Sequence, residues 1–277
     1  MKHRRIPAGR LKELPAARLI PNIVTLLGLC AGITAIKFAL SGNWQGAVAA
    51  IMIASLLDVL DGGMARLLGA NSSFGAELDS LADMVSFGVA PAVLVYTWVM
   101  HDAGTLGWAL VLLFCICCAL RLARFNTGLG DDDRPPWAYR YFTGVPTPAG
   151  AGIVMLPLVL SFNFDNEFFG HVALNSAVIV FISLMMVGRL PTYSLKRIRV
   201  PHKFVVPVML GVGLLAACLV GSPWMTLSAI GVLYLASLPL SWRSYRRSAR
   251  RAAEERFDTP APEADTAPAD DTDTIRP

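Results

Sequence analysis

Long apolar segments recur along the chain, separated by short polar joints. A helix needs about 20 apolar residues to cross the hydrocarbon core of a bilayer. On this criterion we place membrane helices at residues 20–40, 44–68, 73–100, 104–126, 147–163, 171–191, 204–221 and 223–242. The fifth segment is short and holds Pro146, Pro148 and Pro157, so we expect it to be kinked or tilted. The pattern predicts an all-α, polytopic membrane helical bundle with about eight transmembrane helices.

The composition supports a membrane protein. Of the 277 residues, 55% are hydrophobic and 16% are charged, against about 45–50% and about 25% in soluble domains. These values argue against a soluble enzyme, a disordered protein and a nucleic-acid-binding domain. The five cysteines all lie in apolar segments, so we expect no structural disulfide.

Basic residues fall almost entirely on one side of the predicted bundle. Of the 24 Lys and Arg residues, 23 lie at helix ends or in joints on that side, and only Lys37 lies near the other. Cytoplasmic loops are rich in Lys and Arg, so we expect both termini in the cytoplasm. We divide the chain into a basic amino end (1–19), a transmembrane domain (20–242), and a basic stretch with an acidic, disordered tail (243–277). We expect no cleaved signal peptide.

Five acidic residues lie inside two predicted membrane helices, where charge is costly. They are Asp58, Asp61, Glu77, Asp79 and Asp83. An ionisable group at the bilayer centre costs about 2.5–3.5 kcal/mol, so such groups usually face a cavity and carry function. The pairs 58/61 and 79/83 have helical spacings that place each pair on one face. Because the two helices should form an antiparallel hairpin, the four aspartates should meet at one depth.

Four carboxylates in a poorly solvated site need protons or cations between them. An all-oxygen site without His or Cys suits Mg²⁺ or Mn²⁺, and shared carboxylates favour two ions. Such sites usually handle phosphate, which Arg66 could also bind. Buried ion-paired structure and an ion or proton transporter are the alternatives. Transport predicts acids spread along a path, whereas these acids cluster at one depth.

The spacing Asp58-x2-Asp61-Gly62-x2-Ala65-Arg66-x8-Gly75-x3-Asp79-x3-Asp83 resembles the signature of the CDP-alcohol phosphotransferases, integral membrane enzymes of phospholipid synthesis. Further segments resemble the bacterial membrane branch of the family that makes phosphatidylserine. They are residues 80–92, Arg121-Leu-Ala-Arg124-Phe-Asn126, residues 144–149, and Pro21-Asn22-x2-Thr25.

The resemblance implies roles for individual residues. Asp58, Asp61, Asp79 and Asp83 correspond to metal ligands, and Asp83 also to the proposed general base. The residues implied to contact CDP-diacylglycerol or to border its nucleotide pocket are Pro21, Asn22, Ile23, Val24, Gly62, Arg66, Ser72 and Gly75. The family resemblance also implies a homodimer in the bacterial inner membrane, with the active site facing the cytoplasm.

The implied reaction transfers the phosphatidyl group from CDP-diacylglycerol to the hydroxyl of L-serine and releases CMP. Glycerol 3-phosphate, inositol or choline as the acceptor is the alternative within the family. Candidate residues for binding serine or phosphate are Arg121, Arg124, Asn126 and Thr147. Arg121 and Arg124 could instead only anchor the helix at the membrane surface.

Overall fold

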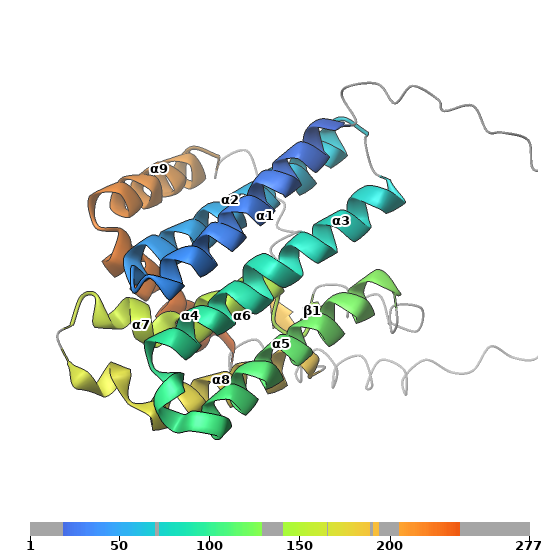
Figure 1. The fold of residues 1–277 in the computed structure, drawn as a ribbon. Helices are drawn as coiled ribbons and strands as arrows, with labels where there is room; N and C mark the ends of the chain where they lie inside the picture. Colours follow the sequence, from blue (N-terminus) through green and yellow to red (C-terminus); the bar gives the residue numbers. More distant parts are fainter. Residues whose placement is uncertain are drawn as a thin grey trace, which may run out of the picture.

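The computed structural model describes residues 19–69, 72–128, 141–164, 166–188, 191–193 and 205–238. Within this part the chain is a bundle of helices (Figure 1). The predicted basic amino end, except Leu19, and the predicted acidic tail lie outside the described residues.

The first two helices form a tight hairpin. α1 (Leu19–Leu40) and α2 (Trp44–Leu67) pack along their whole length and lie side by side in Figure 1. Small buried residues such as Ala35, Ala47 and Ala54 let the two backbones approach closely. Asn43 begins α2, because its side-chain oxygen accepts a hydrogen bond of 2.9 Å from the Gly46 backbone N–H.

The third membrane helix is continuous but changes its winding in the middle. It consists of α3 (Ser73–Asp83), a π-helical turn η2 (Met84–Val89) and α4 (Ala90–Trp98). Pro91 explains the π turn, because its ring clashes with the carbonyl four residues earlier and it has no N–H to donate. The sequence predicted one helix over 73–100 without this change.

The rest of the bundle follows in sequence order. η3 (Met100–Ala103) leads into α5 (Gly104–Asn126), and η5 (Glu167–Gly170) precedes α8 (Val172–Val187). The fifth predicted helix is divided into α6 (Thr147–Val154) and α7 (Leu156–Ser161), so the expected kink is present. α9 (Val205–Gly221) and a last helix, Pro223–Leu238, complete the described chain.

The structure adds one element that the all-α prediction lacked. β1 (Tyr141–Thr143) and β2 (Pro191–Tyr193) pair as a small antiparallel ribbon in which Phe142 lies opposite Thr192. Each strand has three residues. The ribbon joins the segment before α6 to the segment after α8.

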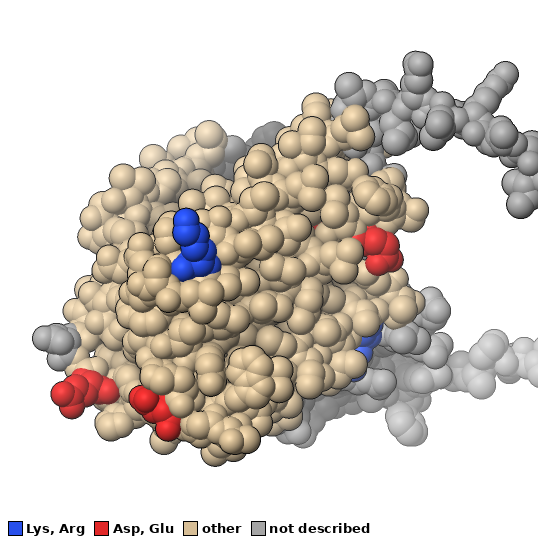
Figure 2. Space-filling model, viewed as in Figure 1, with Lys and Arg blue, Asp and Glu red and all other residues tan. Residues whose placement is uncertain are grey.

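Four described helical segments are long and apolar enough to cross a membrane: Leu19–Leu40, Trp44–Leu67, Ser73–Trp98 and Met100–Asn126. Three further apolar helices, Val172–Val187, Val206–Gly221 and Pro223–Leu238, are shorter. The face shown in Figure 2 is largely uncharged, with its few charged side chains mostly toward the ends of the bundle. Large apolar side chains such as Ile33, Leu56 and Leu120 are exposed. This surface suits contact with lipid.

Candidate active site

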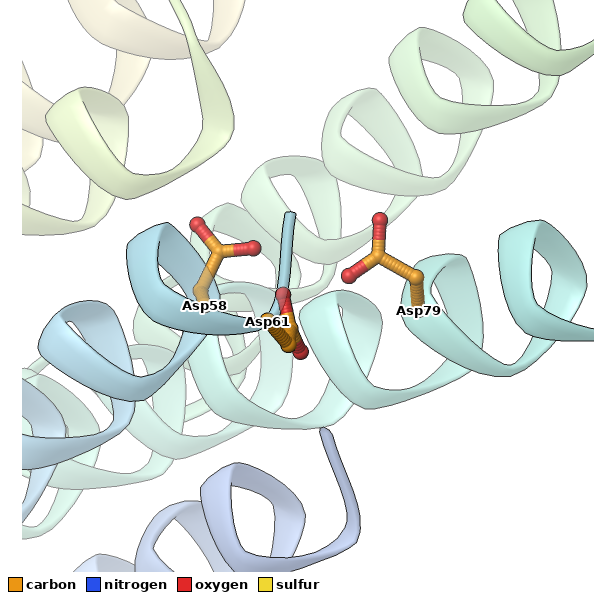
Figure 3. A group of neighbouring side chains, drawn as sticks. All are labelled: Asp58, Asp61 and Asp79. Atoms are coloured by element: carbon orange, nitrogen blue, oxygen red, sulfur yellow. The ribbon is translucent and has the colours of Figure 1, made fainter. Parts of the chain in front are cut away.

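Three aspartate side chains converge between α2 and α3. Asp58 and Asp61 come from α2 and Asp79 from α3, and one carboxylate oxygen from each lies within 4.8 Å of the others. In Figure 3 the carboxylates of Asp58 and Asp79 point into a common space, with Asp61 between them. Asp61 is 5% exposed. Three of the four aspartates that were expected to converge are therefore close together in the structure.

Asp83 lies one turn beyond Asp79, at the end of α3 and directly before the π turn. It is not one of the three residues in the tight group, but its carboxyl group lies next to that of Asp58. Arg121 of α5 lies close enough to interact electrostatically with Asp83. Asp83 is therefore close both to the group of three aspartates and to the positively charged Arg121 side chain of α5.

Thr25 of α1 holds Asp61 in place. Its hydroxyl donates to Asp61 Oδ2 over 2.6 Å and also lies 3.1 Å from the Pro21 carbonyl oxygen. Thr25 is 6% exposed, so this contact is shielded from water. The sequence analysis did not select Thr25 as a site residue, although the Pro21-Asn22-x2-Thr25 segment contained the signal.

A cavity of about 460 Å³ opens beside the aspartates, a size typical of small-ligand sites. Its lining residues are Pro21, Asn22, Thr25, Asp61, Gly62, Ala65, Arg66, Ser72, Gly75, Ala76 and Asp79. Six residues predicted to contact CDP-diacylglycerol are among them. Ile23 and Val24 are not, and Ile23 is 53% exposed on the outside of α1. Ala65, a small residue of the signature motif, and Ala76, to which the sequence analysis gave no role, also line the cavity.

Small residues and local hydrogen bonds shape the cavity wall. A Cβ at Gly62 would meet no atom within 4 Å, whereas one at Gly75 would lie 3.0 Å from Asn22 Oδ1. The Ser72 hydroxyl begins α3 by accepting from the Gly75 N–H over 3.0 Å. Arg66 Nε donates to the Gly62 carbonyl oxygen over 2.9 Å, which holds the guanidinium at the exposed side of the cavity.

The donor set fits a hard divalent cation. Among the described residues, none of the four aspartates forms an ion pair with Lys or Arg, so their negative charge is not balanced by a direct partner. Carboxylate oxygens at this spacing are the ligands that Mg²⁺ and Mn²⁺ prefer. With cations between the carboxylates and Arg66 at the rim, the cavity suits a diphosphate.

The four candidates for acceptor binding separate into two groups. Arg121 donates from Nη1 to the hydroxyl of Thr147, which is fully buried, and this pair lies beside Asp83. Arg124 Nη1 instead donates to the Val187 carbonyl oxygen over 3.0 Å, which ties α5 to α8.

Asn126 contacts α3 rather than an open space. Its side-chain oxygen accepts from the Ser80 hydroxyl over 3.0 Å, and its amide nitrogen lies 3.5 Å from Glu77 Oε2. The structure therefore brings Arg121 and Thr147 to the aspartates, and gives Arg124 and Asn126 contacts that join helices.

Apolar helices around a group of carboxylates suit a membrane enzyme, and sequence comparison identifies the family. The profile described as CDP-alcohol phosphatidyltransferase matches residues 18–188, and the one described as CDP-alcohol phosphatidyltransferase 2 matches residues 203–239. The chain belongs to the CDP-alcohol phosphatidyltransferase family, as the aspartate spacing predicted. It is an integral membrane protein.

Curated relatives carry a more specific name. A Mycobacterium tuberculosis protein is 37% identical over 229 residues, covering 83% of this chain and 80% of its own. A Helicobacter pylori protein is 33% identical over 224 residues, covering 81% of this chain and 91% of its own. A Bacillus subtilis protein is 37% identical over 146 residues, covering 53% and 77%. Each is named CDP-diacylglycerol–serine O-phosphatidyltransferase.

Proposed function

We propose that this chain transfers the phosphatidyl group of CDP-diacylglycerol to the hydroxyl of L-serine, giving phosphatidylserine and CMP. The observation that carries the proposal is the convergence of Asp58, Asp61 and Asp79 beside a cavity of about 460 Å³. The shared name of relatives that are 33–37% identical supports serine as the acceptor. Membership of a transferase family argues against the transporter alternative.

Asp58, Asp61 and Asp79 would hold Mg²⁺ or Mn²⁺, two ions in our proposal, with Asp83 completing the set. When bound, the ions neutralise the diphosphate of the substrate and the charge on departing CMP. The cavity residues bind the nucleotide side of CDP-diacylglycerol: Pro21, Asn22, Gly62, Arg66, Ser72 and Gly75 line it. Ile23 and Val24 lie outside the lining, on the same helix as Pro21 and Asn22.

Asp83 acts as the general base. A serine hydroxyl is too weakly acidic to ionise unaided at neutral pH, so a positioned carboxylate is needed. The Asp83 carboxylate takes the hydroxyl proton as the serine oxygen attacks the phosphorus on the lipid side. The new phosphorus–oxygen bond forms while the bond to the CMP oxygen breaks, and CMP leaves with that electron pair. Arg121, close to Asp83, orients the acceptor.

We propose eight membrane crossings for the whole chain, with both termini and the active site on the cytoplasmic side of the bacterial inner membrane. The basic residues of the sequence support this orientation. Arg66 and Arg124 lie in the last turns of α2 and α5, at the end where the cavity opens, while Lys37 lies in the last turn of α1 at the opposite end. We also propose a homodimer, as in the family the sequence resembles.

An acceptor panel tests the proposed function. The purified chain in detergent micelles is given radiolabelled CDP-diacylglycerol, Mn²⁺ or Mg²⁺, and one of L-serine, glycerol 3-phosphate, inositol or choline. We expect serine-dependent release of CMP and labelled phosphatidylserine. The variant Asp83→Asn serves as the inactive control. Turnover with another alcohol and none with serine would overturn the acceptor assignment, and no metal-dependent release of CMP with any alcohol would overturn the reaction.

A further inference from the structure

The last helix, Pro223–Leu238, carries a tyrosine into the bundle next to the site. Three contacts fix its inner face. Trp224 packs edge-on against Phe162 with ring centroids 4.9 Å apart, and the Asn163 amide donates to the Ser228 hydroxyl over 3.0 Å. The third contact is at Gly231.

Gly231 permits the closest approach of this helix. A Cβ there would lie 2.6 Å from Leu156 Cδ1 of α7, so any larger residue would require the Leu156 side chain to shift. Positions 224, 228, 231 and 234 follow one another at helical spacing, so they share one side of the helix. The same face that docks against α7 therefore turns Tyr234 toward the interior.

Tyr234 lies near Arg121 there. The Tyr234 phenol and the Asp83 carboxyl group are both within electrostatic range of the Arg121 guanidinium. Within the described part of the chain, the Tyr234 hydroxyl and Arg121 Nε are both buried and neither has a hydrogen-bond partner. Buried polar groups are normally paired, so two neighbouring unpaired donors call for an explanation.

A bound anion would pair both groups. Both groups can donate a hydrogen bond, and Nε–H of Arg121 adds a positive charge. Arg121 is already anchored through Nη1 by Thr147, so its Nε–H is held in place for a ligand. A carboxylate offers two acceptor oxygens and a negative charge, which matches one guanidinium N–H and one phenol O–H.

We propose that Tyr234 and Arg121 bind the carboxylate of the acceptor alcohol, which makes Tyr234 a specificity-determining residue contributed by the last helix. This inference rests on the proposed function, in which the acceptor is L-serine. Binding the carboxylate at Arg121 places the rest of the amino acid beside Asp83, where its hydroxyl must lose a proton. Tyr234 lies outside the main family match at 18–188 and inside the match at 203–239.

The test compares Tyr234→Phe with the unmodified full-length enzyme in detergent, using two acceptors. L-serine carries a carboxylate, and serinol has a hydroxymethyl group in its place. Loss of a hydrogen bond to a charged group predicts that the KM for L-serine rises about tenfold or more. The KM for CDP-diacylglycerol and the kcat/KM for serinol stay unchanged, so the preference for L-serine over serinol falls by the same factor.

Tyr96→Phe is the matched control, because it removes a phenol hydroxyl from α4, where the Tyr96 ring packs on Trp108 at 5.2 Å. It should leave all three constants unchanged. An unchanged KM for L-serine in Tyr234→Phe would overturn the inference, as would an equal loss with both acceptors, which indicates a purely structural role. Failure of the unmodified enzyme to use serine would instead refute the proposed function, independently of Tyr234.

Discussion

The Thr25 hydroxyl on α1 donates a 2.6 Å hydrogen bond to Asp61 on α2, and this bond orients a carboxylate of the proposed metal site. Groups that hydrogen bond to metal ligands fix the orientation of those ligands, and their loss typically costs about 10–100-fold in metal affinity or activity. We therefore expect Thr25→Val, which keeps the side-chain shape and removes the hydroxyl, to weaken Mn²⁺ binding by about 10–100-fold. Mn²⁺ binding to the purified variant, followed by electron paramagnetic resonance, measures this directly.

Two variants control for packing. Thr25→Ser keeps the hydroxyl and should restore most of the Mn²⁺ affinity. Thr34→Val removes a hydroxyl from the same helix, where Thr34 donates only to the Cys30 carbonyl oxygen, and should leave Mn²⁺ binding unchanged. If Thr25→Val binds Mn²⁺ as tightly as the unmodified enzyme, Thr25 does not position a metal ligand.

Asp58 provides a direct test of the metal site. Its carboxylate is one of three whose oxygens lie within 4.8 Å of one another, so Asp58→Ala should abolish Mn²⁺ binding and CMP release. Chelation with EDTA should abolish CMP release by the unmodified enzyme, and added Mn²⁺ or Mg²⁺ should restore it. Asp102→Ala is the control, because Asp102 is exposed in η3 and pairs with His101. Normal metal dependence in Asp58→Ala would rule out Asp58 as a ligand.

Asp83 should separate binding from chemistry. Asp83→Asn keeps the shape of the side chain but cannot accept the serine proton, so kcat should fall by about 10²–10⁴-fold. Binding of CDP-diacylglycerol, measured by competition with a labelled nucleotide analogue, should fall far less than kcat, because the asparagine side-chain oxygen can still contact an ion. Glu77→Gln is the control on the same helix, since Glu77 is exposed and lies off the aspartate stripe. A kcat near that of the unmodified enzyme in Asp83→Asn would exclude the general-base role.

The aspartate group could be predicted from the sequence because local helical geometry determines it. Asp58 and Asp61 are three residues apart and Asp79 and Asp83 four, and a short joint makes their helices antiparallel. Thr25 could not be placed in the same way, because it is 36 residues from Asp61 and meets it only through packing of α1 against α2. The same limit applies to Tyr234, whose position depends on contacts between the last helix and α7.

The acceptor candidates show where residue chemistry alone is insufficient. Arg121, Arg124 and Asn126 share one segment and all can bind an anion or a polar group. Only the tertiary contacts distinguish them: Arg124 bonds to α8 and Asn126 to α3, while Arg121 alone of the three is a neighbour of Asp83. The π turn after Asp83 was also not predicted, because winding changes of this kind depend on packing as well as on Pro91.

That π turn leads to a prediction about how Asp83 is held. Ser86, within the turn, lies against α1 and donates to the Gly28 carbonyl oxygen over 3.3 Å. A Cβ at Gly32 would lie 2.8 Å from Ser86 Cα, so Gly32→Ala must push the π turn and α1 apart. Overpacking of this kind typically costs about 1–3 kcal/mol.

We therefore expect Gly32→Ala to lower both the thermal stability in detergent and kcat, since Asp83 is the residue directly before the turn. Gly152→Ala is the matched control, because a Cβ there meets nothing within 4 Å and alanine favours a helix. Thermal unfolding and CMP release, measured on both variants, separate the outcomes. If Gly32→Ala loses stability but keeps kcat, the contact supports only the fold. If it loses both, the packing of the π turn on α1 also sets the position of the base.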